Sequence, residues 1–354
     1  MKTKIYFICP SNNFASGGVK QIYRQVETLN KNGFEAYLLL KKKRKKENWF
    51  NSDVPANYSP LIFKQLKYLY KKKKINFFRN IILKFLKVQS KKIEADSILV
   101  FPEIYGPNIH EIEPKIFKVI FNQNCYYTFQ YFSIYESYKT IPYNHTKTLA
   151  TIVASKDAER YIKYAFQDTK VLTMSLGIDD KIFGYSKNKE KQISFMPRKL
   201  GDDVIQVINI LKQRNNLKDW KLIPIENKSE TEVAEIMKKS IIFLSFNHKE
   251  GFGLPPIEAM SCGCYVVGYT GQGGKEYFNP EFSSPVEDGN IIEFVQKIED
   301  IIKTYEKNPE EILFKGKIAS EFVLENYNLN IEINDTIKNW KHIQISHLNR
   351  NINY

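Results

Sequence analysis

Short apolar runs alternate with longer helical patterns along almost the whole chain, and this alternation restricts the possible folds most strongly. Apolar runs of this kind are typical of strands that are buried on both faces of a parallel sheet, with helices between them. The pattern predicts an α/β protein with two doubly wound parallel-sheet (Rossmann-like) domains in tandem, which bind ligands beyond the carboxyl ends of their strands. The predicted strands cover residues 4–10, 35–40, 97–103, 117–124 and 149–155 in the first series and 170–177, 191–199, 220–225, 240–246 and 264–269 in the second, and the predicted helices cover residues 19–31, 203–213 and 229–239.

Length and composition agree with this prediction. A chain of 354 residues with 43% hydrophobic residues is long enough for two globular cores. The four cysteines form no CxxC pair and have no histidine at a zinc-binding spacing, so we expect them to be reduced and mostly buried. No apolar run is long enough for a signal peptide or a membrane span. These features predict a cytoplasmic protein that binds no structural metal.

The stretch KEGFGLPPIEAMSCGCYVVG, from Lys249 to Gly268, carries the strongest chemical signal. It follows a buried strand and has the pattern of a glycine loop, a short helix and a further strand. The backbone N–H groups at the start of a helix have no partner within the helix and attract anions. Gly251 and Gly253 allow close approach of the backbone to a ligand, and Pro255 and Pro256 fit a first helical turn.

Two carboxylates lie on either side of this glycine loop. Glu250 stands at the end of the strand and Glu258 lies one or two turns into the helix, so both side chains can point into one crevice. Carboxylates accept hydrogen bonds from sugar hydroxyls, and the amides between them suit phosphate, so the combination suggests a nucleotide-sugar. The alternative is an ordinary β-to-α connection whose glycines serve the turn and whose glutamates are solvated. Spacing alone does not separate these two interpretations.

The positive charge of the chain lies in one segment. Residues 41–92 contain 17 Lys and Arg residues and only two acidic residues, which accounts for the whole net charge of +14. Phe78, Ile81, Ile82 and Phe85 recur there at helical spacing. A basic amphipathic helix of this kind can lie on an anionic membrane surface. Alternatively, the apolar stripe packs on the domain core and the lysines lie in solvated loops. Nucleic acid is the weakest candidate ligand, because no known nucleic-acid motif accompanies the charge.

Several motifs, in order, resemble those of one enzyme family. EGFGLPPIEAMSCGCYVV resembles the C-terminal domain signature of the retaining GT-B glycosyltransferases of family 4 (glycosyl transferases group 1), in which two glutamates flank seven residues. SNNFASGGVKQIYRQVETLNKNGFEAYLL is similar to the N-terminal glycine loop and first helix of the family. IVASKDAERYI, MSLGID, FMPRK and GQGGKEYF resemble further segments. The resemblance covers roughly residues 1–282, with the Lys-rich segment 41–92 as a local addition.

The resemblance implies a domain plan and a reaction. Residues 1–170 would form an acceptor-binding domain and residues 171–325 a nucleotide-sugar-binding domain, facing each other across a cleft. Residues 326–354 would form a helix that crosses back to the first domain. The enzyme would move a sugar, with retention of its anomeric configuration and without metal or cofactor, onto a glycan or lipid-linked glycan. The expected setting is the synthesis of a bacterial surface polysaccharide (capsule, O-antigen or lipopolysaccharide), at the inner face of the membrane.

The resemblance also assigns roles to single residues of the donor site. Glu258 would hold the ribose hydroxyls, and Glu250 would contact hydroxyls of the donor sugar. Arg198, with Lys199, would neutralise the diphosphate as it leaves. The remaining donor-binding residues would be Gly17, Gly18, Gly251, Phe252, Gly253, Leu254 and Asn124.

Two departures from the family pattern limit this transfer of roles. Lys199 directly follows Arg198, whereas the family has its lysine several residues later. Where the family often has a histidine after a strand of the first domain, this chain has Gln123 and Asn124, which cannot act as a base at neutral pH; His145 is a possible substitute. We expect Gln123, Tyr126 and Glu103 at the acceptor, although Glu103 also fits a capping role and the aromatic residues after Asn124 also fit the core.

Two other functions remain compatible with the sequence. A nucleotide-sugar 2-epimerase shares the two-domain fold and the ligand class, but needs no acceptor. A non-catalytic basic protein that binds membranes or polyanions would not need Glu250, Glu258 and Arg198 at all.

Overall fold

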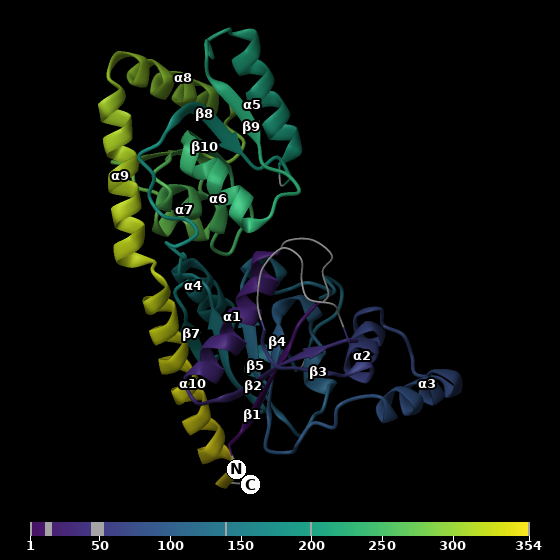
Figure 1. The fold of residues 1–354 in the computed structure, drawn as a ribbon. Helices are drawn as coiled ribbons and strands as arrows, with labels where there is room; N and C mark the ends of the chain where they lie inside the picture. The colour runs from purple at the N-terminus through teal and green to yellow at the C-terminus, as the bar shows by residue number, and fades with distance from the viewer. Residues whose placement is uncertain (1, 11–15, 44–52, 139, 199, 353–354) are drawn as a thin grey trace. The chain divides into compact units, whose positions relative to one another are not determined.

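The computed structural model describes residues 2–10, 16–43, 53–138, 140–198 and 200–352. The chain divides into two compact units (Figure 1). Unit 1 comprises Met1–Met174 and Ile333–Tyr354, and unit 2 comprises Ser175–Glu332. The two boundaries fall a few residues beyond the positions 170 and 325 that the sequence suggested. Each unit is built on a parallel sheet with helices around it, so the predicted fold class is confirmed.

Unit 1 contains, over its described residues, a seven-stranded parallel sheet in the order β3-β2-β1-β4-β5-β6-β7. The central strands are almost wholly apolar and buried, as strands covered on both faces must be. The strands are β1 (Lys4–Ile8), β2 (Glu35–Leu40), β3 (Ala56–Tyr58), β4 (Ile98–Pro102), β5 (Phe117–Asn122), β6 (Thr148–Val153) and β7 (Val171–Thr173), and the helices are α1 (Gly17–Lys31), α2 (Pro60–Tyr70), α3 (Phe77–Val88) and α4 (Lys156–Ala165), with short 3₁₀ helices η1 (Glu103–Tyr105), η2 (Ile109–Glu111), η3 (Cys125–Tyr127) and η4 (Pro142–Asn144).

Unit 2 contains a five-stranded parallel sheet in the order β12-β11-β10-β8-β9, again over the described part of the chain. Its core packs the apolar sides of the helices on β8, β10 and β11. The strands are β8 (Glu190–Phe195), β9 (Lys221–Pro224), β10 (Ser240–Phe246), β11 (Tyr265–Tyr269) and β12 (Ser283–Val286), and the helices are α5 (Gly201–Gln213), α6 (Glu230–Lys239), α7 (Leu254–Ser261), η5 (Gly273–Glu276), α8 (Ile291–Lys307) and α9 (Pro309–Asn326).

Each sheet reverses its direction of strand addition once. In unit 1 the chain adds β2 and β3 on one side of β1 and then continues with β4 on the other side. In unit 2 it adds β9 on one side of β8 and then continues with β10 on the other. The loops at the carboxyl ends of the two strands diverge at such a reversal and leave a crevice, where α/β proteins bind their ligands. The two reversals therefore indicate where functional residues should be sought.

The last helix, α10 (Leu329–Ile352), contributes its residues from Ile333 onward to unit 1. The indole of Trp340 is fully buried, and its ring centroid lies 5.6 Å from that of Phe7 in β1. Gln25 of α1 donates a hydrogen bond to Thr336 (2.8 Å), and Asn339 donates one to the carbonyl of Thr173 (2.9 Å). The core of unit 1 is therefore completed by the C-terminal end of the chain.

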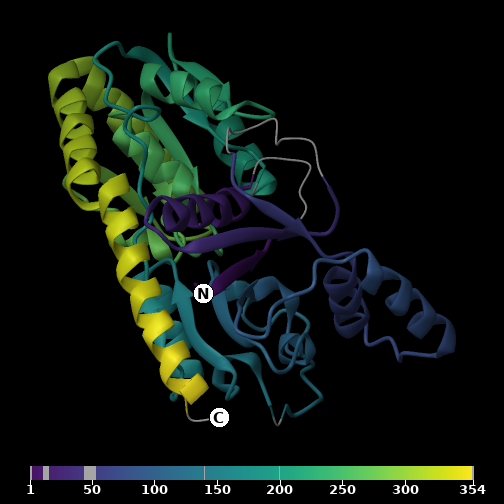
Figure 2. The same cartoon turned by 60° about the horizontal axis from the view of Figure 1, so that its bottom comes forward.

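The Lys-rich segment 41–92 forms β3, α2 and α3 of unit 1, and its residues 44–52 lie outside the described part. Helix α3 extends away from the sheet at the β3 edge (Figures 1 and 2). Only Leu83 of α3 is buried; Phe78, Ile81, Ile82 and Phe85 are 74%, 48%, 42% and 65% exposed. The alternative that this apolar stripe packs on the core is therefore wrong.

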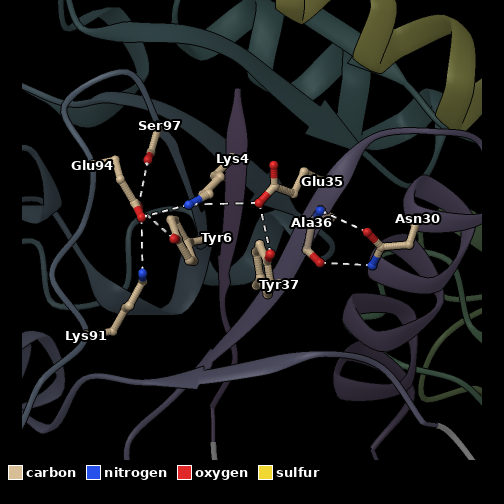
Figure 3. Close-up of polar contacts among 9 residues, drawn as sticks. All are labelled: Lys4, Tyr6, Asn30, Glu35, Ala36, Tyr37, Lys91, Glu94 and Ser97. Atoms are coloured by element: carbon tan, nitrogen blue, oxygen red, sulfur yellow. Dashed lines mark hydrogen bonds and ion pairs between the residues drawn. The ribbon is translucent and has the colours of Figure 1, made fainter. Parts of the chain in front are cut away.

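A polar network ties the connection after α3 to the sheet (Figure 3). The carboxylate of Glu94 accepts hydrogen bonds from the Tyr6 hydroxyl (2.7 Å), Lys4 Nζ (2.9 Å) and Lys91 Nζ (3.0 Å). Desolvation alone would raise the pKa of Glu94, but the hydrogen bonds from Tyr6, Lys4 and Lys91 outweigh it and lower the pKa to about 2. An ionised Glu94 therefore holds the chain between α3 and β4 against β1.

We expect Glu94→Gln to lower the free energy of unfolding by about 1–2 kcal/mol at pH 7, because charge-assisted hydrogen bonds are lost. The folded pKa lies below the ordinary value, so this stabilisation is present above about pH 4.5 and is lost as the pH falls toward 2. Urea unfolding at pH 7 and pH 3 measures both effects. As a control, Glu27→Gln removes an exposed ion pair to Lys31 and should cost less than about 0.5 kcal/mol; equal losses in the two variants would contradict the role of Glu94.

Candidate active site

The first group of candidate residues lies at the carboxyl edge of the unit 2 sheet. Arg198 follows β8, Glu250 follows β10, and Glu258 lies in the helix α7 that starts after the β10 loop. β8 and β10 are neighbours and mark the reversal of strand order in this sheet. The fold thus places these three residues, which the sequence indicated as functional, on adjacent connections. Lys199, the fourth, lies outside the described residues.

Gly253 begins α7 in a conformation that suits glycine. Its φ is +85°, and a Cβ built there would lie 2.0 Å from Nδ2 of Asn247. Leu254 is the first helical residue, and the two prolines after it occupy the first turn. Asn247 thereby fills the space that a side chain at position 253 would need, and the backbone of the loop comes close to the end of β10.

A second glycine loop, residues 270–276 after β11, packs directly on the first. Asn247 donates a hydrogen bond to the carbonyl of Thr270 (3.0 Å), and the Gly273 amide donates one to the carbonyl of Glu250 (3.4 Å). A Cβ on Gly273 would lie 2.0 Å from the carbonyl oxygen of Gly251. The packing of the two loops alone requires glycine at positions 253 and 273. The interpretation that these glycines serve the structure of the loops therefore accounts for both.

Aromatic residues pack against the first glycine loop. The Tyr277 hydroxyl donates to the carbonyl of Gly253 (2.6 Å) and lies within hydrogen-bonding distance of the carbonyl of Phe252 (3.1 Å). The Phe252 ring is only 4% exposed, with ring centroids of Tyr277 and Tyr327 at 5.3 and 5.6 Å. Phe252, which we had placed among the donor-binding residues, thus offers a ligand its backbone and not its ring. Tyr277 and Asn247 were not predicted, because their roles depend on contacts between loops that no local motif shows.

A second group of candidate residues lies in unit 1, at the carboxyl ends of β1, β4 and β5. Gln123, after β5, donates a hydrogen bond to the carbonyl of Gly18 in the first turn of α1 (3.1 Å). Glu103, after β4, accepts one from the backbone amide of Asn124 (3.0 Å). Unit 1 therefore brings together Glu103, Gln123, Asn124 and Gly18, and Gly17 begins the same helix.

Glu103 is a buried carboxyl group. The residue is 6% exposed, and its Oε2 atom has no hydrogen-bond partner among the described residues. Desolvation raises its pKa to about 7, although backbone hydrogen bonds lower it. Glu103 is therefore partly protonated at neutral pH, and its Oε1 atom fixes the loop that carries Gln123 and Asn124.

Tyr126 and its aromatic neighbours remain partly accessible. Four of them are between 44% and 46% exposed, so their rings are not buried in the core: Tyr126, Tyr127, Phe129 and Tyr131. Asn124 Oδ1 accepts a hydrogen bond from the Tyr126 amide (3.0 Å), which places this aromatic group beside Glu103. His145, by contrast, precedes β6 and lies at the opposite, amino-terminal edge of the sheet.

Comparison with known proteins shows similarity to glycosyltransferases. Residues 201–312 match the family model described as glycosyl transferases group 1. This stretch is similar to the domain that these transferases share. It includes Glu250, the β10 loop, α7 and both glycine loops.

The chain is also similar to individual glycosyltransferases and related enzymes. It is 26% identical over 220 residues to an alpha-1,6-glucosyltransferase of Actinobacillus pleuropneumoniae serotype 7 (strain AP76); the match spans 58% of this chain and 64%, just under two thirds, of that protein. The structure resembles a mutant of TarM from S. aureus, in complex with Fondaparinux, alpha-GlcNAc-glycerol and UDP (TM-score 0.67, 14% identity, 97% and 99% of the two chains). It also resembles a sucrose-phosphate synthase from Thermosynechococcus elongatus (TM-score 0.65, 13% identity, 98% and 100%). At these identities the structural matches show the fold, which is GT-B.

The contact between Gly253 and Asn247 leads to a matched pair of substitutions. Gly253→Ala and Gly289→Ala both place a side chain at a φ above +80°, at a cost of about 1–2 kcal/mol. Nothing lies within 4 Å of the Cβ position at Gly289, whereas at Gly253 the new Cβ must displace Asn247. We expect Gly253→Ala to lose a further 1–3 kcal/mol or so in urea unfolding. Equal losses would show that Asn247 does not hold this loop.

Proposed function

We propose that the protein is a retaining glycosyltransferase that moves a sugar from a nucleotide-sugar to a hydroxyl of a glycan, without a metal ion. The observation that carries this proposal is the position of Arg198, Glu250 and Glu258 on adjacent connections at the strand reversal of unit 2. A cation and two carboxylates beside the start of a helix form a binding set for a diphosphate that carries sugars on both sides. The glycosyltransferase domain at residues 201–312 supports the same reaction class.

In this proposal each donor-site residue acts on a different part of the nucleotide-sugar. Glu258 accepts hydrogen bonds from the ribose hydroxyls, and Glu250 accepts them from hydroxyls of the transferred sugar. Arg198, with Lys199 and the amides of Gly253 and Leu254, stabilises the negative charge that develops on the diphosphate as the glycosidic bond breaks. Such fixed donors stabilise the leaving group without a divalent cation.

The residues of unit 1 provide the remaining groups. We assign Gly17 and Gly18 at the start of α1 to the donor phosphates and Asn124 to the donor sugar. Gln123 and the exposed ring of Tyr126 contact the acceptor. Glu103 acts through the loop that it anchors, because its carboxyl group is buried against the backbone of Asn124. The departing phosphate takes the proton of the acceptor hydroxyl.

We further propose that unit 1 lies on an anionic membrane surface through α3. Within the described residues no helix is both long and apolar enough to span a bilayer. The exposed face of α3, formed by Phe77, Phe78, Ile81, Phe85 and Val88, is flanked by Lys84 and Lys87. Such a helix buries its aromatic side chains at the headgroup level while its lysines contact anionic lipids.

An acceptor built on a lipid carrier, as for a bacterial surface polysaccharide, is consistent with that position. The relative from Actinobacillus pleuropneumoniae is a glucosyltransferase by name, which makes a hexose a reasonable first donor to test.

The donor site is tested by thermal unfolding with UDP, GDP and ADP, with and without magnesium. At 100 times its dissociation constant a nucleotide should stabilise the protein by about 2.7 kcal/mol. We expect one nucleotide to do so without magnesium, and the shift to disappear in Glu258→Ala but not in Glu235→Ala, which changes an exposed glutamate of α6. A shift that requires magnesium, or that survives in Glu258→Ala, would contradict the proposed donor site. NMR of the sugar first released from the matching nucleotide-sugar reports whether the configuration is retained, and the absence of a 2-epimer excludes an epimerase.

Membrane contact is tested with vesicles of phosphatidylcholine that contain phosphatidylglycerol. Phe78→Ser with Phe85→Ser should weaken vesicle binding at least about tenfold, because two aromatic rings no longer enter the bilayer. Phe314→Ser is a suitable control, because Phe314 is 62% exposed but lies in unit 2. Binding that is unchanged by the α3 variant, or reduced equally by the control, would exclude α3 as the membrane contact.

A further inference from the structure

Two adjoining cavities in unit 1 lie beside the acceptor residues. They have volumes of about 330 Å³ and 400 Å³, and both are lined by Tyr70 and Tyr105. Tyr70 ends α2, and Tyr105 lies two residues beyond Glu103, at the carboxyl end of β4. We call the two cavities together the acceptor groove, with an aromatic chamber and a lysine chamber.

The aromatic chamber is walled by tyrosines. Tyr70 and Tyr131 stack with their ring centroids 4.9 Å apart. The wall also contains Tyr68, Tyr105 and Tyr138, and its charged residues are Lys72, Lys73, Lys74, Glu111 and Glu136. Tyr131 has a φ of +66°, a conformation that costs a residue with a side chain energy and that is frequent at functional sites. Rigid aromatic faces with a hydroxyl at one end suit the rings of a carbohydrate.

The lysine chamber has a different character. Lys41, Lys64 and Lys67 line it together with apolar side chains, and no carboxylate of the described residues belongs to its wall. None of these three ammonium groups forms an ion pair with a described acidic residue; Lys64 instead lies 5.2 Å from the centre of the Tyr68 ring. In the aromatic chamber, by comparison, Lys72 is paired with Glu136 at 2.6 Å. Three cations without a carboxylate partner among the described residues, in one chamber, favour a multiply charged anion.

The apolar part of the lysine chamber leads to α3. Phe63 and Leu66 come from α2, and Leu86 comes from α3 itself. The wall of the chamber therefore includes a residue of the helix that we place on the membrane. A ligand that combines a strong anion with a hydrocarbon chain matches both the lysines and the apolar wall, whereas a water-soluble polyanion would leave Phe63 and Leu86 without a partner.

We propose that the acceptor groove binds the reducing end of a glycan that is linked to an isoprenyl diphosphate. The sugar rings lie against Tyr70 and Tyr131, the diphosphate lies between Lys64 and Lys67, and the first isoprene units lie on Phe63 and Leu86. This inference rests on the proposed transfer to a glycan and names the class of its acceptor. It explains why the tyrosines and the lysines occur on adjoining walls that share Tyr70 and Tyr105.

The test measures binding of farnesyl diphosphate to the full chain by calorimetry. We expect Lys64→Gln with Lys67→Gln to weaken binding at least about tenfold, because charge-assisted contacts to the diphosphate are lost. Lys303→Gln with Lys307→Gln removes the same charge from exposed positions of α8 in unit 2, away from the groove, and should bind as the parent does. Lys67→Gln alone, at an exposed position, keeps the test valid if the double variant unfolds. Inorganic pyrophosphate and farnesol should each bind at least about tenfold more weakly than farnesyl diphosphate.

Three outcomes would overturn the inference. Equal loss in the groove and α8 variants would indicate a general charge effect. Pyrophosphate that binds as tightly as farnesyl diphosphate, and whose binding is lost in Arg198→Gln, would place the diphosphate in the donor site of unit 2. Binding of a single-stranded oligonucleotide that requires Lys64 and Lys67, while farnesyl diphosphate is unaffected, would point to a nucleic acid. The thermal shift with nucleotide should persist in the groove variant, so a failed acceptor groove and a failed donor site give different results.

Discussion

Parallel strands place all their carboxyl ends at one edge of a sheet, and the functional assignments in this protein depend on that constraint. In unit 2 it brings the connections after β8, β10 and β11 together, although more than 70 residues separate Arg198 from Gly271. In unit 1 it places Glu103 and Gln123 beside the start of α1. The loops themselves are short and Gly-rich, and their positions are fixed by the strands that precede them. Close packing between two loops, through Asn247 and Gly253, then leaves little freedom in the backbone that faces a ligand.

The sequence predicted the sheets well, because their strands are buried on both faces and therefore read as apolar runs. β2 and β10 have the bounds that the pattern indicated, and the segment from β10 to β11 was assigned correctly as strand, loop, helix and strand. The helices α2, α8 and α9 were not predicted. α2 lies in a segment whose lysines suggested a loop-like insert, and its helical start depends on the Ser59 cap and on Pro60.

The candidate site residues could be predicted from the sequence only where they lie close together in one local motif. Glu250, Glu258 and Gly253 lie within nine residues of each other and share such a motif. Asn247 and Tyr277 act across loops, and Tyr70 and Tyr131 meet only because α2 and the loop after β5 lie next to each other in the fold. The sequence showed that the lysines were numerous but not which of them have carboxylate partners. That difference, between Lys72 with its partner Glu136 and Lys67 without a described partner, appears only in three dimensions.

The discontinuity of unit 1 has a consequence for synthesis on the ribosome. Trp340 fills the core against Phe7, so β1 emerges long before the residue that completes its packing. At about 5–20 residues per second, the interval is on the order of half a minute. Unit 2 consists of one uninterrupted stretch, Ser175–Glu332, so all of its residues are synthesised before Trp340. The second unit to be translated can thus be the first to finish folding, while the apolar strands of unit 1 wait for the end of the chain.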